Sequence, residues 1–424
     1  MTIKTEIAQT IVDPRAYADR DRLDAAFTEL RKTAPFDVAA VEGFDPFWVA
    51  TRHADVLEIE RRADVFLNAA KSATLTDKAG DAFVQFVTGG ERNLVRSLVQ
   101  VDGQEHKDLR ALTFPAFTPK ALKVLEDQIR EIAREFVDQL LAKAPECDFA
   151  SEVAFLYPLR VVMRVLGVPQ EDEPFMLKLT QELFGPNDPD MNREKKEVPP
   201  EQVMQMMQQT MLDLEGYFGE VTKKFRAQPE SCINSLIANA KINGEYLTHR
   251  QMMGYYIIAA TAGHDTTANT TAAAMWALAE NPDVLAKLKA DPSAMAGFIE
   301  ETIRWASPVK HFMRTAIADV EVAGKQMKAG DWVMLSYHSA NRDEDVFEAP
   351  FEFRIDRPIH KHVAFGSGPH VCLGQHLARM EMRILWEELL PRISEVSLAG
   401  TPKLTQSSFV SGPKSVPIRF TVAN

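Results

Sequence analysis

The chain has 424 residues, of which 46% are hydrophobic and 25% charged, as is typical of a folded globular protein with a large core. Lysine and arginine number 48 against 60 acidic residues, and the net charge of −12 argues against nucleic acid as the main partner. We expect no membrane span and no secretion signal, because the sequence lacks a long apolar run, and the three widely spaced cysteines favour a reducing cytoplasm.

Short elements alternate in the first third of the chain. Residues 21–34 predict a helix, residues 47–51 a strand and residues 53–66 a second helix. Thr118 and Pro119 then mark a helix start. The apolar residues after it recur at spacings of three and four, which predicts a core helix: Leu122, Leu125, Ile129, Ile132, Phe136 and Leu140.

The remaining chain predicts longer helices and then strands. Residues 185–200 contain four prolines and mixed charges, so we expect a long loop that is either a lid or a solvated connector. Residues 248–280 predict one helix of about 50 Å. Short strands with glycine turns follow over residues 320–335, and a helix that follows Cys372 runs to about Leu390. Without an internal repeat or a linker, we expect one mainly helical domain over residues 1–424, with small β-sheets.

The segment around Cys372 carries the sharpest chemical signal. Phe365, Gly368, Cys372 and Gly374 stand in the pattern Phe-x-x-Gly-x-x-x-Cys-x-Gly, where a rigid turn leads to a cysteine at a helix start. Such a position favours a thiolate, and Gly374 lets a flat ligand approach the backbone. Zinc and iron–sulfur clusters need further cysteines or histidines, so one thiolate on a metal indicates haem. A buried structural cysteine, or a zinc protein without haem, is the alternative.

A second signal lies in the middle of the long predicted helix. Gly263 and the neighbouring Thr266 and Thr267 are poor helix formers, and a threonine hydroxyl there competes for a backbone carbonyl. Asp265 beside Thr266 is an acid–alcohol pair that can deliver protons to a bound ligand. Taken alone, the segment is more often a kink without function.

Glu301 and Arg304 form a third and weaker signal. The same spacing of three residues occurs at Glu58/Arg61 and Glu131/Arg134, and it is usually a surface contact on a helix.

The cysteine segment resembles the haem-binding loop of the cytochrome P450 superfamily, and the resemblance extends over essentially the whole chain. Finer similarity, for example at residues 157–159, 262–267 and 312–316, is to the soluble bacterial terpineol hydroxylase subfamily. The resemblance implies the cytochrome P450 fold, with haem b between the long central helix and the cysteine-loop helix.

The resemblance also implies roles for single residues. Cys372 would be the iron ligand, Phe365 and Gly374 would lie against the haem, and the N–H groups of Leu373 and Gly374 would donate to the sulfur. Asp265 and Thr266 would deliver protons to bound oxygen. The haem propionates would bind His106, Arg110, Arg314 and His370, although many relatives have arginine in place of His370. Glu301 and Arg304 would form a structural network whose third member lies in residues 341–343 or 354–357.

By family position, a substrate pocket would be lined by apolar residues, which predicts a hydrophobic ligand of roughly ten to fifteen carbons. These residues are Phe83, Phe86, Val87, Phe184, Ala259, Ala262, Val309, Phe312, Phe409 and Val410. Each taken singly is more often ordinary core.

We therefore expect a cytoplasmic, monomeric monooxygenase that inserts one atom of O2 into a C–H bond of a terpenoid or aromatic hydrocarbon. Electrons would come from a [2Fe-2S] ferredoxin and its NADH-dependent reductase, which could dock near Lys361, Arg379 and Arg383. The alternatives are a peroxide-dependent haem-thiolate peroxygenase and a non-catalytic haem sensor.

Overall fold

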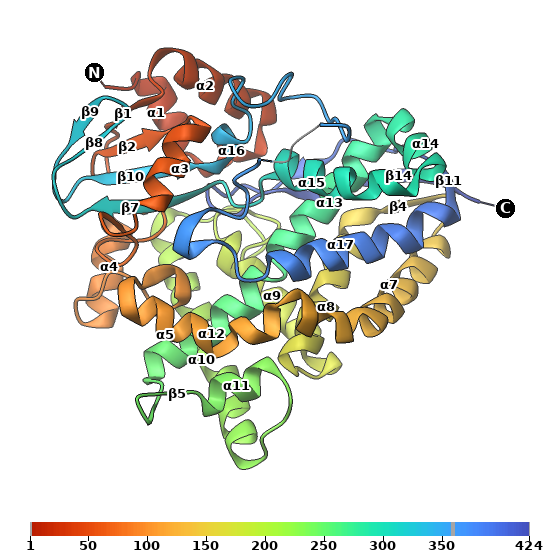
Figure 1. The fold of residues 1–424 in the computed structure, drawn as a ribbon, viewed down its shortest axis with the longest axis horizontal. Helices are drawn as coiled ribbons and strands as arrows, with labels where there is room; N and C mark the ends of the chain where they lie inside the picture. Colours follow the sequence, from red (N-terminus) through yellow and green to blue (C-terminus); the bar gives the residue numbers. More distant parts are fainter. Residues whose placement is uncertain (1, 358–360, 424) are drawn as a thin grey trace.

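The computed structural model describes residues 2–357 and 361–423 (Figure 1). Its helices are α1 (Thr5–Val12), α2 (Arg20–Thr33), α3 (His53–Arg61), α4 (Lys78–Thr88), α5 (Gly103–Thr113), α6 (Pro119–Leu122), α7 (Glu126–Leu141), α8 (Leu156–Leu166), α9 (Glu173–Phe184), α10 (Pro200–Ala227), α11 (Ile233–Asn239), α12 (His249–Ala262), α13 (Asp265–Glu280), α14 (Pro282–Ala290), α15 (Met295–Ala306), α16 (Tyr337–Ala340) and α17 (Gln375–Leu389).

The strands form one mixed sheet and several small antiparallel ones. The mixed sheet has the order β1-β2-β10-β7-β3, with β2 and β10 parallel. A second sheet has the order β11-β14-β4, and the remaining strands pair as hairpins or ribbons. The bounds are β1 (Phe36–Ala39), β2 (Phe47–Ala50), β3 (Phe66–Leu67), β4 (Glu146–Asp148), β5 (Lys241–Ile242), β6 (Glu245–Tyr246), β7 (His311–Ala316), β8 (Val320–Val322), β9 (Lys325–Met327), β10 (Trp332–Ser336), β11 (Ile393–Leu398), β12 (Lys403–Leu404), β13 (Pro413–Ser415) and β14 (Pro417–Val422).

The mixed sheet lies at the N-terminal side of the molecule, the sheet of β11, β14 and β4 lies at the opposite side beside α14, and helices lie between and below them (Figure 1). Helix α13 runs through the interior and packs against α8, α15 and β11. Its alanines are almost completely buried, and their small side chains allow this close packing on several sides: Ala268, Ala272, Ala273, Ala274 and Ala277. Helix α17 packs against α7 and α15, so the segment after Cys372 is anchored in the main core.

Most predicted helices are confirmed, but three predictions are wrong in detail. The single core helix predicted after Thr118 is divided into α6 and α7 by a 3-10 turn at Lys123–Leu125. The helix predicted over residues 53–66 ends at Arg61, because Phe66 and Leu67 pair with β7 instead. The single helix predicted over residues 248–280 is two helices, interrupted at Gly263 and His264. Among the described residues, no helix has the length and apolar character needed to cross a membrane.

The loop predicted over residues 185–200 is irregular, as expected, but it is attached to the core. Asp188 is fully buried and accepts hydrogen bonds from Lys414 Nζ at 2.6 and 2.8 Å. The backbone N–H of Gln406 also donates to Asp188, at 2.8 Å. In this structure the loop is therefore closed against β13 and the segment that precedes it.

Candidate functional site

Cys372 lies between a tight turn, Gly368–His370, and the start of α17. Its backbone N–H donates to the carbonyl of Phe365 at 2.8 Å, which closes the loop. Gly368 has a φ of 67°, and a Cβ there would lie 2.5 Å from the carbonyl oxygen of Glu60. Only glycine fits that position, which explains its place in the sequence pattern.

Opposing effects act on the Cys372 thiol. Burial raises its pKa, while the backbone N–H groups of Gly374 and Gln375 and the guanidinium groups of Arg110 and Arg379 lower it. The donors are therefore Gly374 and Gln375, where the sequence predicted Leu373 and Gly374. Because burial opposes the thiolate, a cation bonded to the sulfur would supply the stabilisation that remains.

The surroundings of Cys372 suit a flat metal complex. Within residues 2–357 and 361–423, no group of three or more His, Cys, Asp or Glu side chains could hold a metal ion. A metal at Cys372 would therefore take its other ligands from a prosthetic group. A Cβ at Gly374 would meet no atom within 4 Å, so there is open space beside the loop. Phe365 is packed under the guanidinium of Arg379, whose central carbon lies 4.5 Å from the ring centre.

Basic side chains from separate elements gather beside the loop. The rings of His106, from α5, and His370 lie 4.0 Å apart. Arg110 Nη2 donates to the carbonyl of Val371 at 2.8 Å, and Arg314, on β7, is buried. The structure thus brings together all four side chains that the sequence assigned to the propionates.

This cluster has two carboxylates that the sequence interpretation missed. Asp102 Oδ1 lies 3.4 Å from His370 Nε2, and Glu60 Oε1 lies 3.9 Å from Arg314 Nη2. Burial together with His370 and Arg110 lowers the pKa of His106 to about 4, and burial raises the pKa of Glu60 to about 7. The shift of Glu60 disfavours its negative charge, so the guanidinium groups of Arg110 and Arg314 are in excess and a dianionic ligand beside the cluster would fit them.

The interruption between α12 and α13 places Asp265 and Thr266 at a helix start. Thr266 Oγ1 donates to the carbonyl of Ala262 at 2.7 Å, which is the competition for a backbone carbonyl that the sequence predicted. Asp265 is buried, and its Oδ2 lies 3.4 Å from Nδ1 of His264. Thr266 is only partly buried, whereas Asp265 is buried.

Glu381 is a further buried acid that the sequence interpretation missed. It lies on α17, and its carboxyl is hydrogen bonded to Thr267 of α13, while burial raises its pKa well above the ordinary value. The sequence did carry a signal for this residue, because an acid that shares the apolar face of a helix with Leu377, Ile384 and Leu385 is expected to be buried.

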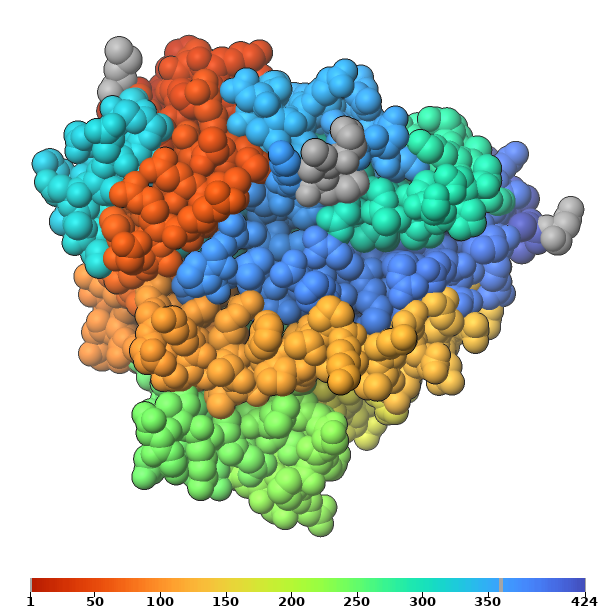
Figure 2. Space-filling view, viewed as in Figure 1, coloured from red at the N-terminus to blue at the C-terminus, as the bar shows by residue number. Residues whose placement is uncertain are grey.

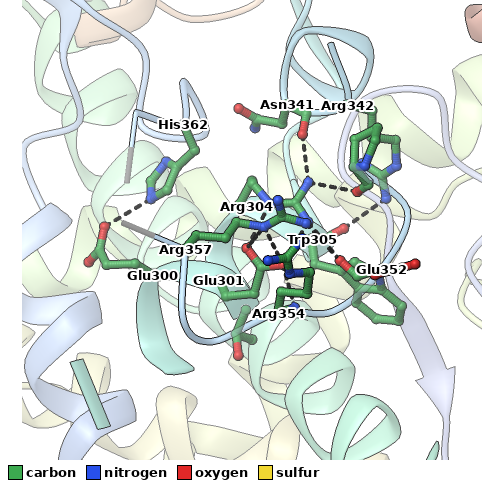
Figure 3. Close-up of polar contacts among 12 residues, drawn as sticks. Glu300, Glu301, Arg304, Trp305, Asn341, Arg342, Glu352, Arg354, Arg357 and His362 are labelled. Carbon is green, nitrogen blue, oxygen red and sulfur yellow. Dashed lines mark hydrogen bonds and ion pairs between the residues drawn. The ribbon is translucent and has the colours of Figure 1, made fainter. Parts of the chain in front are cut away.

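Glu301 and Arg304 form the centre of a buried ion-pair network (Figure 3). Arg304 Nε and Nη2 donate to the two oxygens of Glu301 at 2.7 and 2.8 Å. Arg357 Nε lies 3.0 and 3.1 Å from the same oxygens, so Arg357 is the third member. Arg304 also donates to the carbonyls of Asn341 and Pro350, which joins α15 to the segment before the cysteine loop.

Seven of the ten predicted pocket residues lie in two places, around Phe409 and at the end of α12. Phe409 contacts Phe184 and Phe312, with ring centres 6.1 and 5.3 Å apart, and Val309 bridges to Val410. Ala259 and Ala262 lie at the end of α12, next to the interruption.

The prediction is wrong for Phe86 and Val87, because their side chains lie on the outer side of α4. Phe86 is 85% exposed and Val87 36% exposed, whereas Phe83 on the same helix is half-buried. The sequence interpretation also missed His311, a buried residue whose Nδ1 lies 2.9 Å from the Ser408 carbonyl and whose ring faces Phe409.

Comparison with known proteins shows to which family a chain with this cysteine loop belongs. The family model described as Cytochrome P450 matches residues 66–418. The chain belongs to the cytochrome P450 family. It is 45% identical to "Cytochrome P450-terp" of a Pseudomonas species, over all of this chain and 99% of that protein. It is 32% identical to a steroid C26-monooxygenase of Rhodococcus jostii, over 97% of this chain and 84% of that protein.

Solved structures agree with this assignment. A cytochrome P450 of Novosphingobium aromaticivorans, CYP108D1, superposes with a TM-score of 0.91 at 42% identity and full coverage of both chains. A Mycobacterium marinum cytochrome P450, solved in complex with pseudoionone, superposes with a TM-score of 0.86 at 29% identity and covers 94% of this chain and 95% of that one. The fold is therefore that of a cytochrome P450, and the chain is a haem-thiolate enzyme with haem b as cofactor. The cysteine loop, the open space at Gly374 and the basic cluster fit that group.

Proposed function

We propose that this cytochrome P450 hydroxylates a small hydrophobic substrate, a terpenoid or an aromatic hydrocarbon, with electrons from a ferredoxin. The observation that carries the proposal is the position of Cys372 at the start of α17, with N–H donors, basic groups and an acid–alcohol pair on surrounding elements. The same chain is proposed to form one domain, to act as a monomer and to work in the cytoplasm.

The residues that would hold the haem come from distant parts of the chain. Cys372 would bind the iron, Phe365 and Gly374 would lie against the ring, and His106, Arg110, Arg314 and His370 would bind the propionates. Asn68 Nδ2 lies 2.8 Å from Nε2 of His370 and can only donate, so a neutral His370 carries its hydrogen on Nδ1 and can donate it to a propionate. When bound, haem supplies the activation of O2 and the oxidation of the substrate C–H bond.

Asp265 and Thr266 would manage the protons that this chemistry consumes. The Thr266 hydroxyl lies at the interruption of the helix and can exchange its hydrogen bond to Ala262 for one to a ligand. Asp265 is the adjacent acid, and it can return a proton to the Thr266 hydroxyl after that hydroxyl has given one to the ligand. Glu381, on α17 beside Thr267 of α13, is a second buried carboxyl.

The substrate class is inferred from the pocket and from the names of relatives. The residues that gather at Phe409 are apolar, and they leave few polar partners for a ligand. "Cytochrome P450-terp" and the pseudoionone complex point to terpenoid-sized molecules for those proteins. We therefore propose a substrate of roughly ten to fifteen carbons with one or two polar groups at most.

Electrons would enter at the face that carries α17. Figure 2 shows this segment at the surface, between the band of α5 to α7 and the α14–α15 segment. Arg379 and Arg383 are about one-third exposed there, and Lys361 is exposed. Arg379 pairs with Glu300, and Arg383 with Glu126 and Glu387, so a ferredoxin would have to compete with these carboxylates.

The test has two variants of the holoenzyme. We expect Cys372→Ser to lose the thiolate-type ferrous–CO spectrum, and a variant that keeps it would refute the ligand assignment. We expect Thr266→Ala to keep haem and substrate binding while NADH oxidation with ferredoxin produces hydrogen peroxide in place of product. Fully coupled hydroxylation by Thr266→Ala would remove this residue from the mechanism, and faster turnover with added peroxide than with NADH would favour a peroxygenase.

A substrate-induced spin-shift screen over terpenoids, alkylbenzenes, polycyclic aromatics and steroids tests the substrate class. We expect the terpenoids and alkylbenzenes to give the largest shifts. A response to steroids alone would contradict the proposed size of the pocket.

A further inference from the structure

His264 is a fully buried imidazole between α12 and α13 that none of the roles above includes. Its Nε2 lies 2.8 Å from the carbonyl oxygen of Phe155, and its Nδ1 lies 3.2 Å from Thr180 Oγ1. The same Nδ1 lies 3.4 Å from Oδ2 of Asp265. The ring therefore connects α9, the segment before α8 and the proposed proton donor.

These contacts restrict which atoms carry hydrogen. A carbonyl oxygen can only accept, so His264 Nε2 must carry a proton and donate to Phe155. Thr180 Oγ1 lies 3.1 Å from the carbonyl of Leu177, which can take the single hydroxyl hydrogen. In that case Nδ1 must also carry a proton, and His264 is a cation that faces Asp265.

The alternative arrangement leaves the acid without a partner. If Thr180 donates to Nδ1, the imidazole is neutral and presents a lone pair toward Asp265. Asp265 Oδ2 is buried and has no hydrogen-bond partner among the described residues, and Nδ1 of His264, 3.4 Å away, is the cationic group that can face it. Leaving a charged oxygen in that state costs several kcal/mol in general, so the charged His264 and Asp265 stabilise each other.

We propose that His264 is a positioning residue that holds the carboxylate of Asp265 in place until Asp265 passes a proton toward Thr266. The inference rests on the proposed proton delivery by Asp265. Thr180 belongs to α9, which also carries the pocket residue Phe184, so a shift of α9 on substrate binding would alter the contact of His264.

Three elements present polar groups to His264, and one of these groups carries a charge. Asp265, on α13, presents its carboxylate, while α9 presents the Thr180 hydroxyl and the segment before α8 presents the Phe155 carbonyl. Asp265 raises the pKa of His264, and burial opposes it. The ionisation of His264 should therefore depend on Asp265.

The first experiment measures this ionisation directly in the holoenzyme. The protein would be labelled with [¹³Cε1]histidine, and the ferrous–CO form, which is diamagnetic, would be titrated by NMR. The His264 resonance would be identified by its loss in His264→Gln. We expect its titration midpoint to lie above the ordinary value of about 6.5 and to fall in Asp265→Asn. A midpoint that does not change in Asp265→Asn would overturn the proposed pairing.

The second experiment measures coupling in a double-mutant cycle. We expect Asp265→Asn to slow turnover about 100-fold and His264→Phe to slow it roughly tenfold, with more peroxide formed per NADH. If His264 acts through Asp265, His264→Phe should have no further effect in the Asp265→Asn background. We expect His264→Gln, which retains a donor, to recover part of the coupling. Additive effects of the two changes would refute a positioning role.

The control is His338→Gln, since His338 is another buried histidine, held by Asp24 at 2.8 Å outside the site. We expect it to cost stability without releasing peroxide. The ferrous–CO spectrum verifies that each variant folds with haem. If Asp265→Asn alone leaves turnover unchanged, the proposed proton delivery fails, and the NMR titration still decides whether His264 and Asp265 are paired.

Discussion

Replacing Glu301 by glutamine tests how much a buried ion-pair network contributes beyond an exposed pair on a helix. Glu301 is fully buried, and Arg304 and Arg357 both donate to its two oxygens. The backbone N–H of Arg354 donates to the same carboxylate at 2.8 Å. Glutamine has nearly the same shape, so the change removes the charge without opening a cavity.

The magnitude follows from what remains after the substitution. Two guanidinium groups stay buried beside a neutral amide, and breaking a buried pair in this way generally costs about 3–5 kcal/mol. The matched control is Glu58→Gln on α3. Glu58 pairs with Arg62 at 2.8 Å, but these side chains are 41% and 34% exposed, and such pairs contribute about 0.3–0.5 kcal/mol.

The assay is urea unfolding of both variants as holoenzymes, followed by far-ultraviolet circular dichroism and by the Soret band. We expect Glu301→Gln to lower the free energy of unfolding by about 3–5 kcal/mol and to lose haem at lower urea than the parent. Glu58→Gln should unfold within about 0.5 kcal/mol of the parent. Equal effects of the two changes would show that burial does not set the strength of this network.

Two further measurements test other parts of the structure. Burial, together with the nearby Arg342 and Arg20, lowers the pKa of Lys310 to about 7. In the unfolded chain this pKa returns to its ordinary value near 10.4. Between about pH 7 and pH 10.4 the unfolded chain therefore binds more protons than the folded one, and the stability of the fold rises with pH. Lys310→Met should remove that rise, and parallel stability curves for the variant and the parent would contradict the burial argument. Lys414→Met breaks the buried contact to Asp188, so we expect hydrogen exchange of the backbone amides in residues 185–199 to accelerate about 100-fold. Lys195→Met removes an exposed contact in the same loop and should have little effect. Unchanged exchange after Lys414→Met would show that other contacts keep the loop closed.

Local patterns allowed a large part of this protein to be predicted from its sequence. The cysteine loop is contiguous, and its glycines are required by backbone conformation and close approach, which depend on few neighbours. Helix α7 follows from the apolar period that the sequence shows after Thr118, and Ile129, Phe136 and Leu140 are buried as that period predicts. The competition of Thr266 for a backbone carbonyl is likewise a property of one helix turn.

Contacts between distant segments were decided only by the tertiary structure. The third partner of Glu301 could lie in either of two segments, and the packing of the chain selected Arg357, 56 residues away. Asp102 and Glu60 approach the basic cluster from elements that carry no motif, and His264 meets Thr180 across 84 residues. Phe86 has the same hydrophobic character as Phe83, yet the orientation of α4 places it in solvent. Residue type and local spacing determine which chemistry a segment can perform, whereas burial and charge pairing depend on which distant elements pack against it, and that information is not local.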